Sequence, residues 1–217
     1  MDAKEFIARR VALEIQDGEV VNLGIGLPTM VANYLPQDIN VILHSENGFV
    51  GLTKGDGQVI PNLVNAGGKP CGIIPGGAIF DSMMSFALIR GGHVHVSVLG
   101  GLQVDQYGNL ANWMIPGKKV PGMGGAMDLV AGAKKIIVAM EHCAKDGSAK
   151  IVKECTLPLT GKGKVHMIVT ELAVFHVTLE GLILSEVAFG VDVETVKAKT
   201  AAELIVSQHL KTMPINQ

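Results

Sequence analysis

The chain has 217 residues, of which 48% are hydrophobic and 18% are charged. This composition excludes an intrinsically disordered chain, which requires low hydrophobicity and high charge. The length suits a single domain over residues 1–217 that buries its own core. The formal net charge is −2 and no basic run exceeds two residues. We therefore expect neither a nucleic acid nor a membrane as a partner.

The N-terminal segment and the cysteines indicate the cellular compartment of the protein. The first ten residues mix charged with apolar side chains and contain no signal-peptide core. No apolar stretch reaches the roughly 18 residues of a membrane span. Cys71, Cys143 and Cys155 lie far apart and form no Cys-x-x-Cys motif. A reducing, cytoplasmic location is expected.

Strands are predicted to alternate with helices through the first 140 residues. Helical patterns cover residues 2–16, 29–34 and 80–89, and apolar strand patterns cover 19–23, 40–44, 71–74, 93–99 and 134–140, with a surface loop at 53–63. Asp81 is a candidate N-cap, and Pro28 suits a first helical turn. This alternation predicts an α/β fold with a mostly parallel sheet and helices on both faces.

The rest of the chain is richer in β-structure. We expect a hairpin over residues 102–113 and a glycine-rich loop over 116–126. Antiparallel strands are predicted at 165–179 and 182–187, followed by a helix at 192–199. The C-terminal third should either complete the sheet or cover one of its edges.

Several predicted strands end in polar or glycine-containing turns. Ligands of an open α/β sheet bind beyond the carboxyl ends of its strands. The turns in question are Gly24-Ile25-Gly26, Ser45-Glu46-Asn47-Gly48, Pro75-Gly76-Gly77 and Leu99-Gly100-Gly101. These four turns predict a single active-site rim.

One of these turns and a glycine cluster later in the chain could carry chemistry. Glu46 follows an apolar strand directly, so it could act as a general base, a metal ligand or a nucleophile. A solvent-exposed turn glutamate is the commoner alternative. The glycine cluster at residues 122–128 could turn backbone N–H groups toward an anion, as in an oxyanion hole, or form a flexible loop.

Other candidates receive less support from the sequence. The segment from Gly24 to Thr29 lacks the third glycine of a dinucleotide-binding fingerprint. His93 and His95 share one face of a predicted strand, where structural histidines are favoured over a metal pair. No orienting partner is evident for His142-Cys143, and nothing fixes the distance of Asp105 or Asp128 from Glu46.

Motifs along nearly the whole chain resemble those of the beta subunits of family I CoA-transferases. The most specific is Ser45-Glu46-Asn47-Gly48, accompanied by the segments at 21–29, 88–93, 109–118, 122–129, 155–160 and 170–175. Within the family, the acetate or butyrate–acetoacetate type is most similar and the succinyl-CoA:3-ketoacid type second. The resemblance implies the CoA-transferase fold.

The resemblance also implies a mechanism and a set of site residues. Glu46 would be the nucleophile, carrying CoA as a glutamyl thioester in a ping-pong reaction, and the Gly125 N–H would stabilise the oxyanion. CoA would pass between a short-chain acyl-CoA or 3-oxoacyl-CoA and an acid such as acetoacetate, acetate or butyrate. Candidate substrate-binding residues are Asn22, Gly24, Gly26, Asn47, Gly48, Asn112, Lys118 and Gly124. An acyl-CoA hydrolase using the same glutamate and a non-catalytic sensing module are the alternatives.

The family resemblance implies a partner chain as well. The family's alpha chain carries a Gly-x-Gly-Gly-Phe loop, and this chain contains no Gly-Gly-Phe. An α₂β₂ assembly is therefore expected, with CoA as a substrate and no metal or other cofactor. His95 stands where many relatives have Asp, and Lys69 is displaced by one residue from a lysine found in some relatives.

Overall fold

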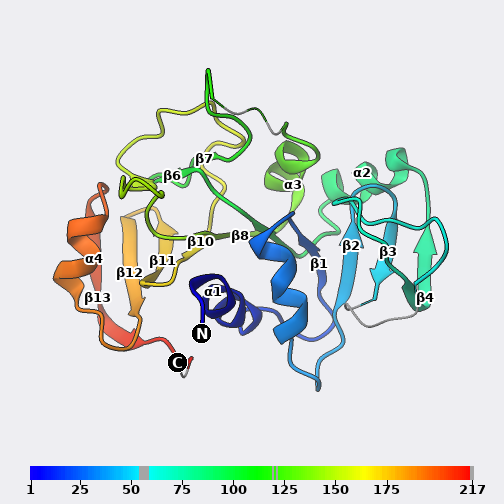
Figure 1. Ribbon diagram of the computed structural model, residues 1–217, viewed down its shortest axis with the longest axis horizontal. Coiled ribbons are helices and arrows are strands. Elements are labelled where there is room, and N and C mark those ends of the chain that lie inside the picture. Colours follow the sequence, from blue (N-terminus) through cyan, green and yellow to red (C-terminus); the bar gives the residue numbers. More distant parts are fainter. Residues whose placement is uncertain (54–58, 119, 121, 216–217) are drawn as a thin grey trace.

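The computed structural model describes residues 1–53, 59–118, 120 and 122–215. Its centre is a ten-stranded sheet with the order β13-β12-β11-β10-β8-β5-β1-β2-β3-β4 (Figure 1). The strands are β1 (Val20–Leu23), β2 (Ile42–Ser45), β3 (Phe49–Leu52), β4 (Ile73–Ile79), β5 (Val96–Leu99), β8 (Lys135–Ala139), β10 (Met167–Val169), β11 (Ala173–Thr178), β12 (Gly181–Val187) and β13 (Leu204–Thr212). A second, three-stranded sheet joins β6 (Gln103–Asp105), β7 (Leu110–Ala111) and β9 (Ile151–Val152).

The middle of the large sheet is parallel, which confirms the predicted α/β class. Strands β2, β1, β5, β8 and β10 pair in parallel. Antiparallel pairs flank them, β2-β3-β4 at one side and β10-β11-β12 at the other. Strand β13 adds to β12 in parallel, so the C-terminal third completes the sheet.

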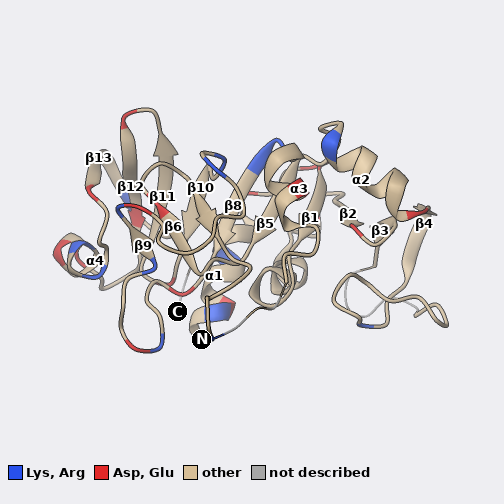
Figure 2. Cartoon of the chain, turned by 90° about the horizontal axis from the view of Figure 1, so that it is seen from above, with Lys and Arg blue, Asp and Glu red and all other residues tan. Residues whose placement is uncertain are grey.

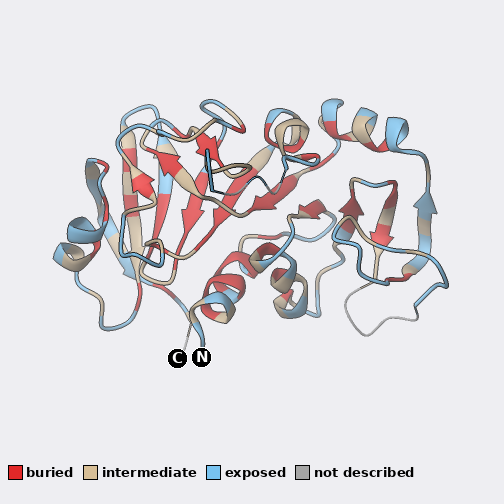
Figure 3. Ribbon diagram, turned by 45° about the horizontal axis from the view of Figure 1, so that its top comes forward, coloured by how far each residue is buried: buried red, intermediate tan, exposed pale blue. Residues whose placement is uncertain are grey.

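Helices cover both faces of the sheet, as predicted. Helix α1 (Ala3–Ala12) and the 3₁₀ helix η1 (Leu27–Tyr34) lie on one face, while α2 (Ser82–Arg90), α3 (Ala126–Gly132) and α4 (Val193–Lys199) lie on the other (Figure 1). Strand β8 shows the division, because Ile137 packs in the core beneath α1 while Ile136 and Val138 pack in the core beneath α3. The central strands are therefore buried on both faces (Figure 3).

Helix capping follows the sequence signals. The Asp81 carboxylate accepts a hydrogen bond from the Met84 N–H at 2.8 Å, and Asp192 does the same for Thr195 at the start of α4. Pro28 lies in the first turn of η1, as predicted, although that element is a 3₁₀ helix. Helix α1 ends at Ala12 rather than continuing to residue 16.

Two strand predictions need correction. The strand expected at 71–74 runs as β4 through Pro75-Gly76-Gly77, which is possible because β4 is an edge strand and its outer N–H groups need no ladder partner. The run at 165–179 is two strands, β10 and β11, which reverse direction at residues 170–172. The Thr170 hydroxyl accepts from the Leu172 and Ala173 N–H groups and stabilises this turn.

Other elements had no counterpart in the sequence interpretation. Strands β3, β9 and β13 and most of α3 were not predicted. His93 and His95 precede β5 instead of lying in it, so they are not a pair on one strand face. Much of the loop predicted at 53–63 falls on residues 54–58, outside the described residues.

Charged residues of both signs are interspersed around the molecule (Figure 2). Within the described residues, no helix has the length and hydrophobicity needed to cross a bilayer.

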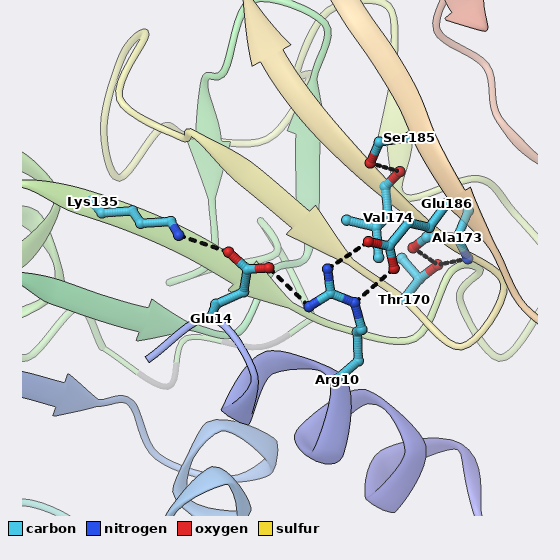
Figure 4. A network of polar contacts seen from close by, with 8 residues as sticks. All are labelled: Arg10, Glu14, Lys135, Thr170, Ala173, Val174, Ser185 and Glu186. Atoms are coloured by element: carbon cyan, nitrogen blue, oxygen red, sulfur yellow. Dashed lines mark hydrogen bonds and ion pairs between the residues drawn. The ribbon is translucent and has the colours of Figure 1, made fainter. Parts of the chain in front are cut away.

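A cluster of four charged side chains fastens α1 to the sheet (Figure 4). The buried Arg10 guanidinium donates two hydrogen bonds of 2.7 Å to Glu186 on β12 and one of 2.9 Å to Glu14. Glu14 also accepts from Lys135 of β8 at 2.8 Å. Burial acts to lower the pKa of Arg10, but its bonds to Glu186 and Glu14 outweigh that effect and raise it.

Replacing Arg10 by Met should destabilise the fold by about 3 kcal/mol, because the partly buried charge of Glu186 would lose its cation and Glu14 would keep only Lys135 as a partner. Arg9→Met is the matched control. Arg9 pairs with Glu5 on the exposed surface of the same helix, and its loss should cost less than about 1 kcal/mol. Urea unfolding of both variants measures the difference. Equal losses in the free energy of unfolding would contradict the conclusion that the Arg10 cluster fastens α1 to the sheet.

His142 is a second buried polar group. Its ring nitrogens lie 3.0 Å from the hydroxyls of Thr170 and Thr200. Burial, together with the positive charges of Lys199 and Lys150, lowers the pKa of His142 to about 4. The folded protein thus holds this imidazole neutral well below its ordinary pKa of about 6.5.

This neutral histidine predicts a pH dependence of stability. In the unfolded chain His142 takes up a proton below about pH 6.5, whereas in the folded chain it does so only below about pH 4. The free energy of unfolding therefore decreases as the pH falls through this window. The loss should total about 3 kcal/mol. Unfolding free energies measured from pH 7 to pH 4.5 should show a smaller drop for His142→Gln than for the wild type. His93→Gln, at an exposed position, should match the wild type.

Candidate active site

Glu46 lies at the carboxyl end of β2, in a turn that only glycine can complete. Gly48 has φ of +132°, and a Cβ atom there would lie 2.3 Å from the Phe80 carbonyl oxygen. The Gly48 carbonyl accepts from the Phe80 N–H at 2.8 Å, which ties the turn to the segment entering α2. The motif Ser45-Glu46-Asn47-Gly48 thus reverses tightly from β2 into β3 and leaves Glu46 half-buried at the rim.

The Glu46 carboxylate has a fixed neighbour on the adjacent strand. Asn22, in β1, donates from Nδ2 to Glu46 Oε2 at 3.0 Å. Asn22 is buried beneath Glu46 and belongs to the lining of neither neighbouring cavity. The predicted substrate-binding residue Asn22 therefore contacts the candidate nucleophile.

Two cavities adjoin Glu46. One, of about 360 Å³, is lined mostly by residues other than glycine and is here named the side-chain cavity. Its lining includes Leu23, Met30, Asn33, Asn65, Lys69 and Cys71. The other, of about 530 Å³, is named the glycine cavity. Its lining includes Gly24, Gly100, Gly101, Gly122, Gly124 and Gly125. Since both linings include Glu46, the carboxylate lies where the two spaces meet.

Gly125 lies directly against the candidate nucleophile. A Cβ atom on Gly125 would lie 3.0 Å from Cγ of Glu46 and 3.4 Å from the Phe86 ring. Gly125 is also the N-cap of α3, with an ordinary φ of −84°. A side chain at Gly125 would therefore crowd Glu46, although the backbone conformation would accept one.

The remaining predicted site residues fall into two groups. Gly24, Asn112 and Gly124 line the glycine cavity. The Asn112 side chain is occupied in holding loops together, since it donates to the Gly100 carbonyl at 3.1 Å and accepts from Thr160 at 2.6 Å. Gly26, Asn47, Gly48 and Lys118 are not part of either lining.

Three of those four residues shape local backbone. Gly26, with φ of +93°, is the N-cap of η1. Asn47 accepts from Ser45 Oγ at 2.6 Å and donates to the Val64 carbonyl at 2.8 Å, and so stabilises the turn together with Gly48. Lys118 is exposed in the loop after Ile115.

The sequence interpretation missed two residues below the site. His44 in β2 and Ser85 in α2 are buried, and His44 also belongs to the lining of the side-chain cavity. The His44 ring lies 3.2 Å from Asn22 Nδ2 and 3.0 Å from Ser85 Oγ. The sequence did offer a signal for His44, because a histidine directly before the Ser-Glu-Asn-Gly motif follows the apolar residues of the same strand. Burial lowers the pKa of His44, although the negative charge of Glu46 opposes this.

Other candidate groups have structural roles. The buried Asp105 accepts from the N–H groups of Tyr107, Asn109 and Cys155. Burial and the charge of Asp105 raise the pKa of Cys155 to about 12, which removes it as a nucleophile. Asp128 pairs with Arg90 at 2.7 Å. Among the described residues, no group of three or more His, Cys, Asp or Glu side chains is arranged to hold a metal.

Comparison with known proteins identifies the family. The sequence profile of the coenzyme A transferase family matches residues 4–199. The chain belongs to the coenzyme A transferase family. The beta chain of the acetate CoA-transferase of Haemophilus influenzae is 65% identical over 100% of this chain and 98% of its own length. That of Escherichia coli K12 is 64% identical over 98% of each. The corresponding chain of the succinyl-CoA:3-ketoacid coenzyme A transferase of Helicobacter pylori is 52% identical over 92% of this chain and 97% of its own.

Solved structures of the family share the fold. The apoenzyme of an acyl-CoA transferase from Escherichia coli O157:H7 superimposes with a TM-score of 0.77 at 26% identity. The match covers 98% of this chain and 43% of that longer chain. Glutaconate coenzyme A-transferase from Acidaminococcus fermentans, at 20% identity and a TM-score of 0.70, has the same fold.

Proposed function

We propose that the chain is the beta subunit of an enzyme that moves CoA between a short-chain acyl-CoA, or 3-oxoacyl-CoA, and a carboxylic acid of the acetoacetate, acetate or butyrate type. The observation that carries the proposal is the position of Glu46 at the junction of two cavities, in a member of the coenzyme A transferase family. The 52% identity to a succinyl-CoA:3-ketoacid transferase makes succinyl-CoA the second candidate donor.

The proposed reaction conserves the thioester. A Glu46 carboxylate oxygen attacks the acyl-CoA carbonyl carbon, the C–S bond breaks, and CoA leaves as the thiolate. The resulting mixed anhydride is attacked at the glutamyl carbonyl by that thiolate, which releases the first acid as a carboxylate. Glu46 then carries CoA as a thioester, and the incoming acid repeats the steps in reverse. No water and no metal take part.

Gly125 supports the first step. Tetrahedral intermediates of acyl transfer place negative charge on an oxygen, and fixed backbone N–H groups stabilise it. The backbone of Gly125 reaches the Glu46 side chain without a Cβ in between, and its N–H is the proposed donor. In this proposal, one of the two cavities beside Glu46 takes the thiol arm of CoA and the other takes the acid.

A partner alpha chain and a cytoplasmic location belong to the same proposal. The relatives from Haemophilus influenzae and Escherichia coli are named as beta subunits, which supports an alpha chain as partner, and we propose an α₂β₂ assembly. The three cysteines are free, in keeping with a reducing compartment.

Initial-rate kinetics test the reaction class. The chain, co-purified with its alpha-type partner, should give parallel double-reciprocal lines for acetoacetyl-CoA and acetate, since a ping-pong enzyme releases its first product before the second substrate binds. Loss of acetoacetyl-CoA at the full rate without added acid would instead identify a hydrolase. Binding of acetoacetyl-CoA without turnover would identify a sensing module.

A further inference from the structure

A line of buried polar groups runs beneath Glu46, from α2 through β2 to β1. Asn22 and His44 are register partners on adjacent parallel strands, so their side chains lie on the same face of the sheet. Their exposed fractions are 1% and 3%, and Ser85, from the helix packed on that face, is fully buried. Polar groups are costly at such positions unless they are hydrogen-bonded, so their arrangement is informative.

The bonding pattern fixes the direction of each hydrogen bond. A carboxylate can only accept, so the Asn22 amide must present its NH₂ group to Glu46 Oε2, 3.0 Å away. The same NH₂ group lies 3.2 Å from His44 Nδ1 and 3.3 Å from the His44 carbonyl oxygen. Because an N–H on Nδ1 would face this donor, Nδ1 is assigned as the unprotonated ring nitrogen. The ring proton is then assigned to Nε2, which donates to Ser85 Oγ at 3.0 Å.

This orientation leaves one group unsatisfied. Asn22 Oδ1 is buried and has no hydrogen-bond partner among the described residues. Turning the amide over would remove the donor from Glu46 and place Oδ1 against its carboxylate. The amide thus holds the orientation that serves Glu46 while its own oxygen lacks a partner, a cost typical of functional sites.

We infer that His44 is a positioning residue for Glu46, acting through Asn22, and that it does so only as a neutral imidazole protonated on Nε2. This inference rests on the proposed role of Glu46 as nucleophile. The neutral ring accepts from Asn22 and keeps its NH₂ group directed at Glu46 Oε2, which leaves the other carboxylate oxygen free to attack. A protonated ring would present N–H to the Asn22 amide and turn it away from Glu46.

The charges around His44 agree with a neutral ring. Asn22 on β1 and Ser85 on α2 are uncharged, and Glu46 is the one charged group among the described residues that acts on His44. Burial outweighs the charge of Glu46 and lowers the pKa of His44, so the ring is neutral at pH 7.

The test compares His44→Gln with His95→Gln in the complete enzyme with its alpha partner. His95 is the matched control, because it also bonds to β1 but accepts from the Val20 N–H at the opposite end of the strand from Glu46. His44→Gln should lower kcat by about 10- to 100-fold, as expected for a misplaced nucleophile, and change the KM for acetate less than about threefold. The acid limb of the pH profile of kcat should also move by at least about half a pH unit in this variant. His95→Gln should match the wild type in kcat, in the KM for acetate and in the acid limb of the pH profile.

Ser85→Ala provides a second variant in case His44→Gln fails to fold. It removes the acceptor of the His44 Nε2 proton, together with the long 3.5 Å hydrogen bond from Ser85 Oγ to the Ser45 carbonyl, and should lower kcat about three- to tenfold without changing KM. Formation of the CoA adduct on Glu46 is measured first in the wild type. If the wild type forms no adduct, the proposed function fails and this inference with it. If the adduct forms and folded His44→Gln, or failing that Ser85→Ala, keeps the wild-type kcat and acid limb, only the positioning role is overturned.

Discussion

Glu46→Ala is expected to abolish CoA transfer, with kcat falling by at least about 10⁴-fold, because the variant has no nucleophile to carry CoA between the two acids. Glu46→Gln should fail equally, since an amide is not a competent nucleophile. Glu46→Asp should also lose most of its activity, because its carboxylate is one methylene shorter and no longer reaches the position now fixed by Asn22 at 3.0 Å.

The fold should survive these substitutions. Glu46 is half-buried, and its hydrogen-bonded partner within the described residues is Asn22. Urea unfolding midpoints close to the wild-type value, together with intact assembly with the alpha chain, would show that the loss is chemical. A folded Glu46→Ala enzyme that transfers CoA near the wild-type rate would contradict the proposed mechanism.

Gly125→Ala should lower kcat by at least about tenfold and leave stability nearly unchanged. The new methyl group would lie 3.0 Å from Glu46 Cγ, so the glutamate must move by a few tenths of an ångström, and reactions of this kind depend strongly on such distances. The φ of −84° suits alanine, so the backbone gains no strain. Gly125→Val should cause a larger loss.

Gly100→Ala separates this contact from a general effect of bulk in the glycine cavity. Gly100 lines the same cavity, and a Cβ there would have no atom within 4 Å. Its activity should fall much less than that of Gly125→Ala, by no more than about threefold, since Glu46 is not displaced. Steady-state kinetics of the two variants decide the matter, and equal losses would mean that the contact with Glu46 is not the cause.

Most of the central strands, helices α1, α2 and α4, and three of the four turns proposed for the rim could be predicted because they depend on local patterns. The apolar strand ending at Ser45-Glu46 and the N-cap at Asp81 are both visible over a few neighbouring residues. The edge strands β4 and β13 were harder to predict over their full length, because their residues are largely exposed and the apolar run at the start of each strand ends after two or three residues. The Pro75-Gly76-Gly77 turn signal was overridden by pairing with β3.

The contacts within the site depend on long-range pairing, which sequence patterns do not encode. Asn22 was a candidate for substrate binding, but the register of β1 against β2 brings it under Glu46. Ser85 reaches His44 only because α2 packs on that face of the sheet. Lys118 was considered for its charge, and the fold leaves it outside both cavities.

Peptide mass spectrometry after reaction with acetoacetyl-CoA tests the central claim most directly. The enzyme, assembled with its alpha chain, is incubated with acetoacetyl-CoA, and the thioester is trapped with borohydride or hydroxylamine before digestion. The account predicts modification confined to the peptide that contains Glu46, and none in Glu46→Gln. A well-assembled enzyme that forms no adduct, or forms it on another residue, would contradict the claim that Glu46 carries CoA.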